Sequence, residues 1–316
     1  MLHTRRDFGK LVLAAIPGTG AVAAGEPHSV YGGVQIGVIA PYSFRGLPND
    51  ADSTLKNLLQ IGFSSTELQS SMVETFAGMP AVSLGRGAGR GTVTPEQEAA
   101  RKTVKDWRLS TSMDKFKALR KMYNDAGVTI YAFKIVAGQP AFTAEEYDYA
   151  FNVVEALGAN QLTMEIPLTN GVPEGSVTKL VGETAARRKI MVGYHAHAQL
   201  KPPATMWDEA LTQSKYNGIN FDMGHYVANT NLSAIPFIQK HHERITSMHL
   251  KDRKFNAGPA TPFGDGDAQV AEVLRLMKRE KYPFPASIEF EYQVPAGSDV
   301  MAEIGKCMKF CQETLA

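Results

Sequence analysis

Eight short apolar segments, separated by stretches with helical character, constrain the fold of this 316-residue chain more than any other feature. Residues 112–126 and 267–280 each place their apolar side chains on one face of a helix. The strand-like segments are residues 34–40, 65–69, 129–135, 161–167, 190–197, 219–225, 245–252 and 285–292. Strict alternation of strands and helices predicts an α/β fold with a parallel sheet. We expect it to close into a (β/α)₈ TIM barrel that occupies residues 30–316 as a single domain.

An open, doubly wound sheet is the alternative arrangement of alternating strands and helices. Such a sheet would call for a glycine-rich phosphate turn after the first strand, and the segment IAPYSFRG does not have this composition. Barrels of this kind commonly contain ~250 residues in one domain, which agrees with the length of the chain. The barrel is therefore the favoured arrangement.

One connection is too long for a compact barrel. Residues 77–111 follow the second strand, and the helical composition from Pro95 to Arg108 predicts a short additional helix within them. The glycine-rich residues 85–91 lack the Gly-Lys-Ser/Thr ending of a phosphate-binding loop. Long loops in compact domains are usually either functional or solvated excursions. The sequence leaves open a lid-like cover over the barrel mouth, a subunit contact and a solvated insertion.

The first 24 residues have the composition of a targeting signal. Arg5 and Arg6 precede Phe8 and Lys10, and a short apolar stretch ends in small residues near Ala21–Ala24. This resembles a twin-arginine export signal and predicts a periplasmic or exported protein. The alternative is a basic amphipathic N-terminus of a cytosolic protein. The apolar stretch is too short and too rich in glycine for a stable membrane anchor.

Composition limits the partners of the protein. The formal net charge is +1, from 33 basic and 32 acidic side chains, so nothing favours a nucleic acid or another polyanion. Cys307 and Cys311 lie four residues apart in a helical segment, where their side chains are poorly placed for a disulfide. We expect buried, inert thiols. Whether the protein forms a homo-oligomer is left open.

Ionisable side chains lie at or near the ends of several of the predicted strands. Glu165, Asp222, His225, His249 and Glu289 come from four different strands of the predicted barrel. The carboxyl ends of parallel barrel strands meet at one mouth, so these side chains should converge. Charged groups inside a barrel are costly unless they are paired or bound to a metal. Glu165, Asp222, His249 and Glu289 are therefore predicted to bind one divalent metal ion.

The ligand set indicates the class of metal and the chemistry. Three carboxylates and one imidazole favour Mn²⁺ or Mg²⁺ and leave Co²⁺, Zn²⁺ and Fe²⁺ open. Four protein ligands leave two positions on an octahedral ion, which two oxygens of a hydroxy-ketone would fill. A metal in this position stabilises the enediolate that forms when the adjacent C–H loses its proton.

Other polar residues are also predicted to point inward at the barrel mouth. His195, His197, Lys134, Glu67 and Lys251 are candidate substrate contacts at the mouth. For one of the histidines, a role in the core or behind the ligands is equally compatible with its position. Lys134 would either hold a substrate oxygen or pair with Glu67 at the rim. Lys251 also fits a rim position or a place behind the ligands.

Six motifs together resemble the sugar phosphate isomerase/epimerase family, the xylose isomerase-like TIM barrels. They are MEIP, YHAH, FDMGH, HLKD, PFGDGD and IEFE, and the resemblance covers nearly all of the chain after residue 24. The resemblance implies that Glu165, Asp222, His249 and Glu289 bind the metal. It also implies that Glu165 and Glu289 exchange the substrate proton and that His225 contacts a substrate oxygen. Glu291 is the rival of Glu289 for the last ligand position, and the Glu-x-Glu pattern favours Glu289.

The resemblance implies several activities. The first is a metal-dependent isomerase or epimerase of a keto-sugar. The alternative is a lyase, either like inosose dehydratase or cleaving a 3-keto-glycoside by β-elimination, and a non-catalytic sugar-binding barrel is less favoured. Endonuclease IV, in the same superfamily, needs three zinc ions and additional histidines. The second and third strands offer Glu67, Gln69 and Lys134 in their place, which argues against a nuclease.

Overall fold

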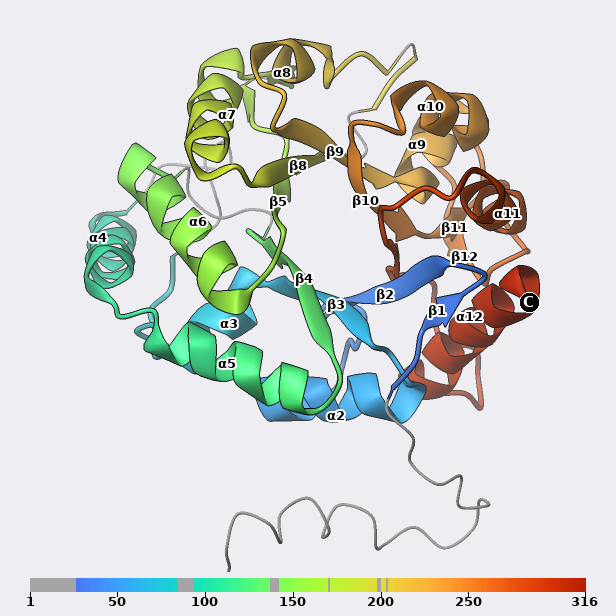
Figure 1. Ribbon diagram of the computed structural model, residues 1–316, viewed down its shortest axis with the longest axis horizontal. Helices are drawn as coiled ribbons and strands as arrows, with labels where there is room; N and C mark the ends of the chain where they lie inside the picture. Colours follow the sequence, from blue (N-terminus) through green and yellow to red (C-terminus); the bar gives the residue numbers. More distant parts are fainter. Residues whose placement is uncertain (1–26, 85–93, 137–141, 170, 198–199, 203) are drawn as a thin grey trace, which may run out of the picture.

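The chain folds into a closed barrel of eight parallel strands surrounded by helices (Figure 1). The computed structural model describes residues 27–84, 94–136, 142–169, 171–197, 200–202 and 204–316. The barrel strands follow one another in the order β2, β3, β4, β5, β8, β9, β10, β13, and β13 pairs with β2 to close the sheet. Their bounds are Val34–Ala40, Ser65–Gln69, Thr129–Lys134, Gln161–Glu165, Met191–His195, Asn217–Asp222, Ile245–Leu250 and Ala286–Ile288. The predicted fold class is confirmed.

The strands are buried on both faces, which explains their apolar composition. Every residue of β9 and of β13 is buried, and all but one of β2 are. In a parallel barrel one face of each strand packs against the outer helices while the other fills the interior. A two-residue strand, β1 (Val30–Tyr31), runs antiparallel to β2 on the outside of the closed set.

The helices form a ring around the sheet, as Figure 1 shows. Several begin at capping side chains that the sequence provides. Asp50 caps α2, Asp299 caps α12, and the carboxylate of Glu146 accepts the backbone N–H of Thr143 at the start of α6. The helices are α2 (Ala51–Ile61), α3 (Ser70–Ala77), α4 (Pro95–Ser110), α5 (Asp114–Asp125), α6 (Ala144–Leu157), α7 (Gly175–Arg188), α8 (Asp208–Gln213), α9 (Met223–Thr230), α10 (Ala234–His241), α11 (Val270–Glu280) and α12 (Val300–Leu315).

A short two-stranded hairpin follows each of two barrel strands, β5 and β10. β6 (Leu168–Thr169) pairs with β7 (Val172–Pro173), and β11 (Asp252–Arg253) pairs with β12 (Ala260–Thr261). No helix in the described part of the chain has both the length and the apolar character needed to cross a bilayer. The predicted export signal and the glycine-rich residues 85–91 lie outside the described residues.

The predicted insertion carries one additional helix, as expected, but its surroundings differ from the expectation. The second strand runs directly into α3, which the sequence analysis did not predict because the segment SSMVETFA is short. The insertion therefore begins after α3. Its helix α4 ends at Ser110, two residues beyond the expected end.

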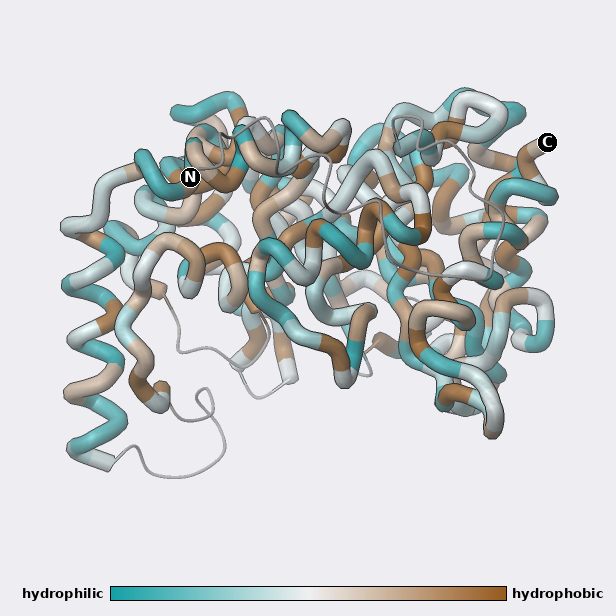
Figure 2. Tube along the Cα trace, turned by 90° about the horizontal axis from the view of Figure 1, so that it is seen from below, coloured by the Kyte–Doolittle hydropathy of each residue, from teal (hydrophilic) through white to brown (hydrophobic). Residues whose placement is uncertain are grey.

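Helix α4 stands beside the barrel. In Figure 1 it lies outside α6, and in Figure 2 it is the leftmost helix and runs along the side of the barrel. The described part of the insertion thus flanks the mouth and does not cross the centre of the barrel. The lid-like role predicted for residues 77–111 stays a prediction.

A buried ion cluster fixes α4 to the barrel. The guanidinium of Arg108 donates two hydrogen bonds to the carboxylate of Glu74 on α3, at 2.7 and 3.0 Å, and a third to Glu146 on α6, at 2.9 Å. Tyr149 donates to the same Glu74 carboxylate, and Phe142 packs against the guanidinium plane at 4.3 Å. Charges removed from water stabilise a fold only when they are fully paired, as they are here.

Replacing Arg108 should therefore loosen the whole insertion. We expect Arg108→Met to lower the free energy of unfolding by about 3–5 kcal/mol, because it leaves the buried Glu74 carboxylate without its cation. Urea denaturation followed by circular dichroism measures this. Lys102→Met on the same helix is the matched control, since Lys102 pairs only at the surface with Asp106, and such pairs contribute about 0.2–1 kcal/mol. Equal losses in the two variants would contradict the account.

Candidate metal-binding active site

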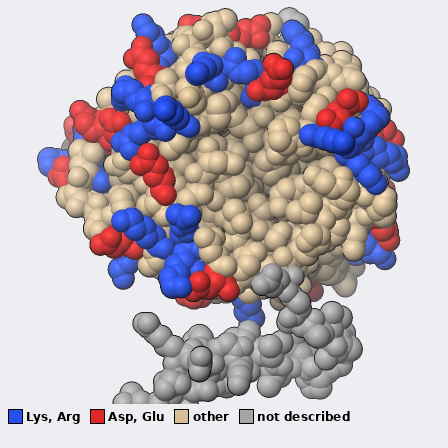
Figure 3. Space-filling view, viewed as in Figure 1, with Lys and Arg blue, Asp and Glu red and all other residues tan. Residues whose placement is uncertain are grey.

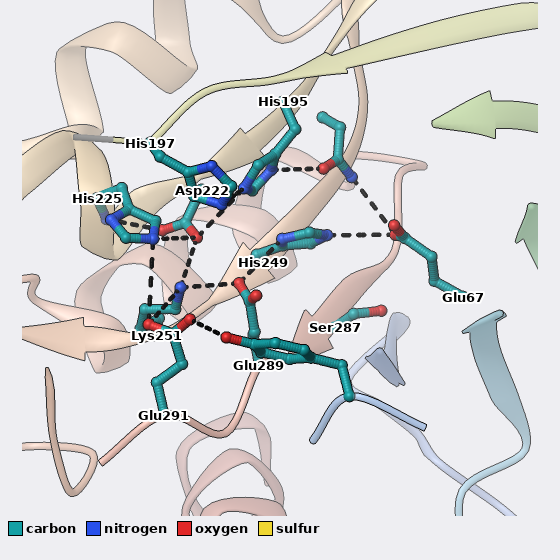
Figure 4. Close-up of polar contacts among 12 residues, drawn as sticks. Glu67, His195, His197, Asp222, His225, His249, Lys251, Ser287, Glu289 and Glu291 are labelled. Atoms are coloured by element: carbon teal, nitrogen blue, oxygen red, sulfur yellow. Dashed lines mark hydrogen bonds and ion pairs between the residues drawn. The ribbon is translucent and has the colours of Figure 1, made fainter. Parts of the chain in front are cut away.

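The polar side chains predicted to converge meet at the carboxyl ends of the barrel strands, and Figure 4 shows Asp222, His225, His249 and Glu289 among them. Glu67 comes from β3, Glu165 from β5, His195 from β8, Asp222 from β9 and His249 from β10. Glu289 directly follows β13, and its amide donates to the carbonyl of Leu250, so it continues the strand pairing. Parallel strands deliver all of these side chains to one end of the barrel.

Four buried residues can offer ligand atoms to a single point. They are His195, Asp222, His249 and Glu289, and one ligand atom of each lies within 4.8 Å of those of the other three. Three of them belong to the predicted metal set. The fourth, His195, was expected to contact substrate.

Glu165 lies in a second group that shares His195 with the first. A ligand atom of Glu165, of His195 and of His197 lie within 4.8 Å of one another. Nδ1 of His197 is 2.9 Å from the Glu165 carboxylate, and Nζ of Lys134 is 3.5 Å from it. His197 faces Oε2, whereas Lys134 faces Oε1, which accepts no hydrogen bond from the described residues. Burial would raise the pKa of Glu165, but Lys134 and His197 hold it below its usual value.

His249 is held between two carboxylates. Its Nδ1 lies 3.1 Å from Glu289, and its Nε2 lies 3.2 Å from Glu67. Burial opposes protonation of the ring, but the two flanking carboxylates raise its pKa to about 9. A carboxylate on one ring nitrogen fixes the tautomer and presents the other nitrogen as a ligand, the usual arrangement behind a metal-bound histidine. Here Glu67 would select Nδ1 as the ligand atom.

Glu67 lies deeper in the barrel than the sequence analysis expected. Its side chain is fully buried and accepts hydrogen bonds from Tyr131, Thr163 and Asn220 as well as facing His249. Lys134, its predicted rim partner, is 3.9 Å away. These contacts favour a supporting role for Glu67 over the substrate contact predicted for it.

His195 is oriented by the strand next to it. Its Nδ1 is 2.8 Å from Oδ1 of Asn220, whose amide nitrogen donates to Ser247 on the other side. The ring therefore carries its proton on Nδ1, and Nε2 keeps a lone pair that faces His197 at 3.1 Å and Asp222 at 3.8 Å. Burial holds the pKa of His195 well below its usual value, so the ring is neutral. A neutral imidazole with a free lone pair is the form that binds metals.

Asp222 has two distinct oxygens. Oδ1 accepts the backbone N–H of His225 at 2.7 Å and so caps the first turn of α9. Oδ2 is left to face the site. The His225 ring that follows accepts a hydrogen bond on Nδ1 from Arg253, and its Nε2 lies 4.0 Å from Glu291. Burial lowers the pKa of His225 to about 2, so its Nε2 carries the proton and can donate to a substrate oxygen.

Lys251 was predicted as a substrate contact, yet its ammonium lies inside the site. Nζ is 2.9 Å from a carboxylate oxygen of each of Asp222, Glu289 and Glu291, and only 1% of the residue is exposed. Burial alone would lower the pKa of Lys251, but the three carboxylates raise it far above its usual value. The lysine is thus a fixed positive charge among the candidate metal ligands.

The last residue of the His-x-Lys-Asp motif shapes the adjoining loop. The carboxylate of Asp252 accepts three backbone N–H groups, from Gly264, Gly266 and Ala268. A Cβ atom at Gly266 would lie only 2.0 Å from that carboxylate, which explains the glycine. The segment PFGDGD thereby folds back on the strand that carries His249 and Lys251.

Some supporting residues were not predicted as members of the site. Asn220, Tyr131 and Ser287 link the ligands from within the barrel, and Tyr131 bonds to both Glu67 and Ser287. Asn220 stands two residues before Asp222, and strand alternation could have placed it on the same inward face. Tyr42, which donates to Glu291 at 2.7 Å, lies in the loop after β2, where no periodic pattern points to it.

Comparison with known proteins supports this architecture at the level of the fold. Neither the protein-family models nor the curated proteins include a match to the chain. Solved structures do match, among them the probable 3-DHS dehydratase AsbF of Bacillus anthracis, with 12% identity and a TM-score of 0.61 over 87% of this chain and 97% of that one. The likeness is one of fold. At such identities it leaves substrate and reaction open.

Other matching structures include a sugar phosphate isomerase/epimerase, a sugar epimerase and a zinc-binding protein. A sugar phosphate isomerase/epimerase of Parabacteroides distasonis matches with 16% identity and a TM-score of 0.59 over 93% of this chain and 100% of that one. An L-ribulose 3-epimerase matches with 12% identity and a TM-score of 0.57, over 89% and 94%. The IOLI protein with a bound zinc atom matches with 11% identity and a TM-score of 0.56, over 89% and 98%. The structural neighbours are thus xylose isomerase-like barrels of the isomerase, epimerase and dehydratase classes.

Proposed function

We propose that the protein is a divalent-metal-dependent isomerase or epimerase that removes the proton next to the carbonyl of a keto-sugar. One observation carries this proposal: four buried donors of the kind that metals bind point at a single position beside the carboxylate of Glu165. The structural neighbours that act as sugar isomerases or epimerases, and the zinc-bound neighbour, support it.

The donor set fits one metal ion. The predicted set of three carboxylates and one imidazole favours Mn²⁺ or Mg²⁺, whereas His195 in place of Glu165 gives two nitrogens and two oxygens. The second nitrogen moves the preference toward Zn²⁺, Co²⁺, Fe²⁺ or Mn²⁺ and away from Mg²⁺. Glu165 remains the alternative fourth ligand. When bound, the ion supplies a Lewis acid that stabilises negative charge on substrate oxygens.

The remaining chemistry belongs to side chains around this position. Glu165, held as a carboxylate by Lys134 and His197, is the proposed base that removes the proton. Glu289 is the proposed acid: it delivers a different proton, taken up before this step, from the other side of the substrate, while the abstracted proton stays on Glu165. His225 donates from Nε2 to a substrate oxygen. General acid–base catalysis of this kind requires carboxylates positioned within hydrogen-bond reach of the reacting C–H.

A lyase is the second candidate function. It shares the first step, but the carbanion then expels a group from the β position, as in a dehydratase or in cleavage of a 3-keto-glycoside. The dehydratase AsbF among the structural neighbours favours keeping it. A non-catalytic sugar-binding barrel is the third and weakest candidate.

Deuterium exchange separates these functions. We expect the metal-loaded protein to incorporate deuterium from D₂O next to the carbonyl of a keto-sugar, and Glu165→Gln to slow this by ~10²–10⁴-fold because the base is lost. NMR follows deuterium uptake and product release together. Release of water or of an aglycone would identify a lyase.

Metal content provides the control for that experiment. Glu165→Gln should retain the fold and bind metal within about tenfold of the wild type, because it leaves all four buried donors in place. Exchange that proceeds equally well in Glu165→Gln, or no exchange across a panel of keto-sugars and 3-keto-glycosides, would contradict the proposed base.

Glu67 should act on the metal through His249. We expect Glu67→Gln to weaken metal binding ~10–100-fold, since it removes the carboxylate that orients the ring and increases its basicity. Competition with a chromophoric chelator measures the affinity. Ser287→Ala is the control, because it removes a hydrogen bond to Tyr131 in the same buried network without touching His249. A loss in Glu67→Gln no larger than in this control would rule out the supporting role.

We also propose that the protein is exported through the twin-arginine pathway to the periplasm. The proposal rests on Arg5, Arg6, Phe8 and Lys10 and on the small residues near position 24. We expect replacement of both arginines by lysine to retain the protein in the cytoplasm, since the pathway recognises the arginine pair. Cell fractionation measures this, and unchanged periplasmic protein would contradict it.

A further inference from the structure

Lys251 lies among the candidate metal ligands, so its charge bears on how strongly the site binds a metal. The inference drawn from its position rests on the proposed metal-dependent function. The ammonium lies 2.9 Å from Oδ2 of Asp222 and 2.9 Å from Oε2 of Glu289. These oxygens face the two histidines of the ligand group. Oε2 of Glu289 is 3.1 Å from Nδ1 of His249, and Oδ2 of Asp222 is 3.8 Å from Nε2 of His195.

The same two oxygens would therefore serve both cations. Metal–oxygen bonds are about 2.1 Å long, so an ion on these oxygens would lie within about 5 Å of Nζ. Both cations would sit in a buried site, where water screens their repulsion poorly. Lys251 cannot leave toward solvent without uncovering its charge, because only 1% of the residue is exposed.

Glu291 offers the lysine a partner that the metal does not use. Its Oε2 also lies 2.9 Å from Nζ, yet Glu291 is absent from the group of four converging donors. The hydroxyl of Tyr42 donates to the other oxygen, Oε1, at 2.7 Å and so holds the carboxylate in place. Figure 4 shows Glu291 on the far side of the ammonium from His249 and Glu67.

We propose that Lys251 is a built-in cation that neutralises Asp222 and Glu289 before metal binding, and that it gives up these two contacts and retains the one to Glu291 when a metal binds. Lys251 thus competes with the ion for two oxygens, and Glu291 lowers the cost of that competition. Lys251 and Glu291 together set the metal affinity of the site, although neither of them is a metal ligand. It also keeps the buried carboxylates paired while the site is empty of metal, which prevents their mutual repulsion from opening the barrel mouth.

Mn²⁺ titration followed by the EPR signal of the free ion tests this without reference to activity. We expect Lys251→Met to bind Mn²⁺ at least about tenfold more tightly than the wild type, and Glu291→Gln to bind about tenfold more weakly. A purely electrostatic effect of each charge on the metal, without any exchange of partners by Lys251, would also make Lys251→Met bind more tightly and Glu291→Gln more weakly. The double variant decides between the explanations, because only contacting, coupled residues give non-additive effects.

In the Lys251→Met background, Glu291→Gln should change the affinity less than about twofold, because there is no lysine left for Glu291 to receive. If the effects of the two substitutions on Mn²⁺ affinity were additive, the proposed role of Lys251 and Glu291 would be wrong, while the metal site itself would be unaffected. Tyr42→Phe is the matched control: it keeps every charge and frees Glu291, so it should weaken binding less than Glu291→Gln does.

Two outcomes cover the remaining cases. Glu291→Gln retains the lysine, so unchanged Mn²⁺ affinity in that single variant overturns the proposal even where Lys251→Met does not fold. Absence of Mn²⁺ binding in the wild type and all variants would overturn the metal-dependent function and this inference with it.

Discussion

Pairing of buried charge at the barrel mouth is the constraint on which the rest of the site depends. Glu67, Asp222 and Glu289 are all nearly or fully buried, and an isolated carboxylate in such a place is very costly. The protein meets this cost with Lys251 and with His249, which stands between two of the carboxylates. A metal ion joining this group must be accommodated by rearranging cations that are already there.

The fold could be predicted from the sequence because its signal is repeated. Every barrel strand lies within or close to its predicted segment, and residues 34–40 and 65–69 match β2 and β3 at both ends. Helix α3 was missed because eight residues carry too little periodicity, although its end at Ala77 coincides with the predicted start of the insertion. The extra helix α4 was found from composition alone, whereas its buried anchor Arg108 was not, since its partners Glu74 and Glu146 are remote in sequence.

Strand alternation could predict which side chains point inward but not how deep they lie. Asp222, His249 and Glu289 converge as expected. Glu67 was placed at the mouth, although it stands two residues before the end of β3 and is enclosed by Tyr131, Thr163 and Asn220. Three candidate ligands, Asp222, His249 and Glu289, need a fourth. Whether Glu165 or His195 joins them depends on the register between β5, β8 and β9. That register is a property of the closed barrel and leaves no local trace in the sequence.

The two oxygens of Asp222 have a consequence for how the site and the fold are connected. One oxygen caps the first turn of α9 and the other faces the cations, so a single side chain belongs to a helix terminus and to the candidate metal site at once. Fraying of that turn would release the carboxylate, and occupation of the site would hold the turn in place. Binding at the site and formation of the first turn of α9 are therefore coupled, so that binding should slow fraying of the turn. Hydrogen exchange at the His225 amide would measure this coupling.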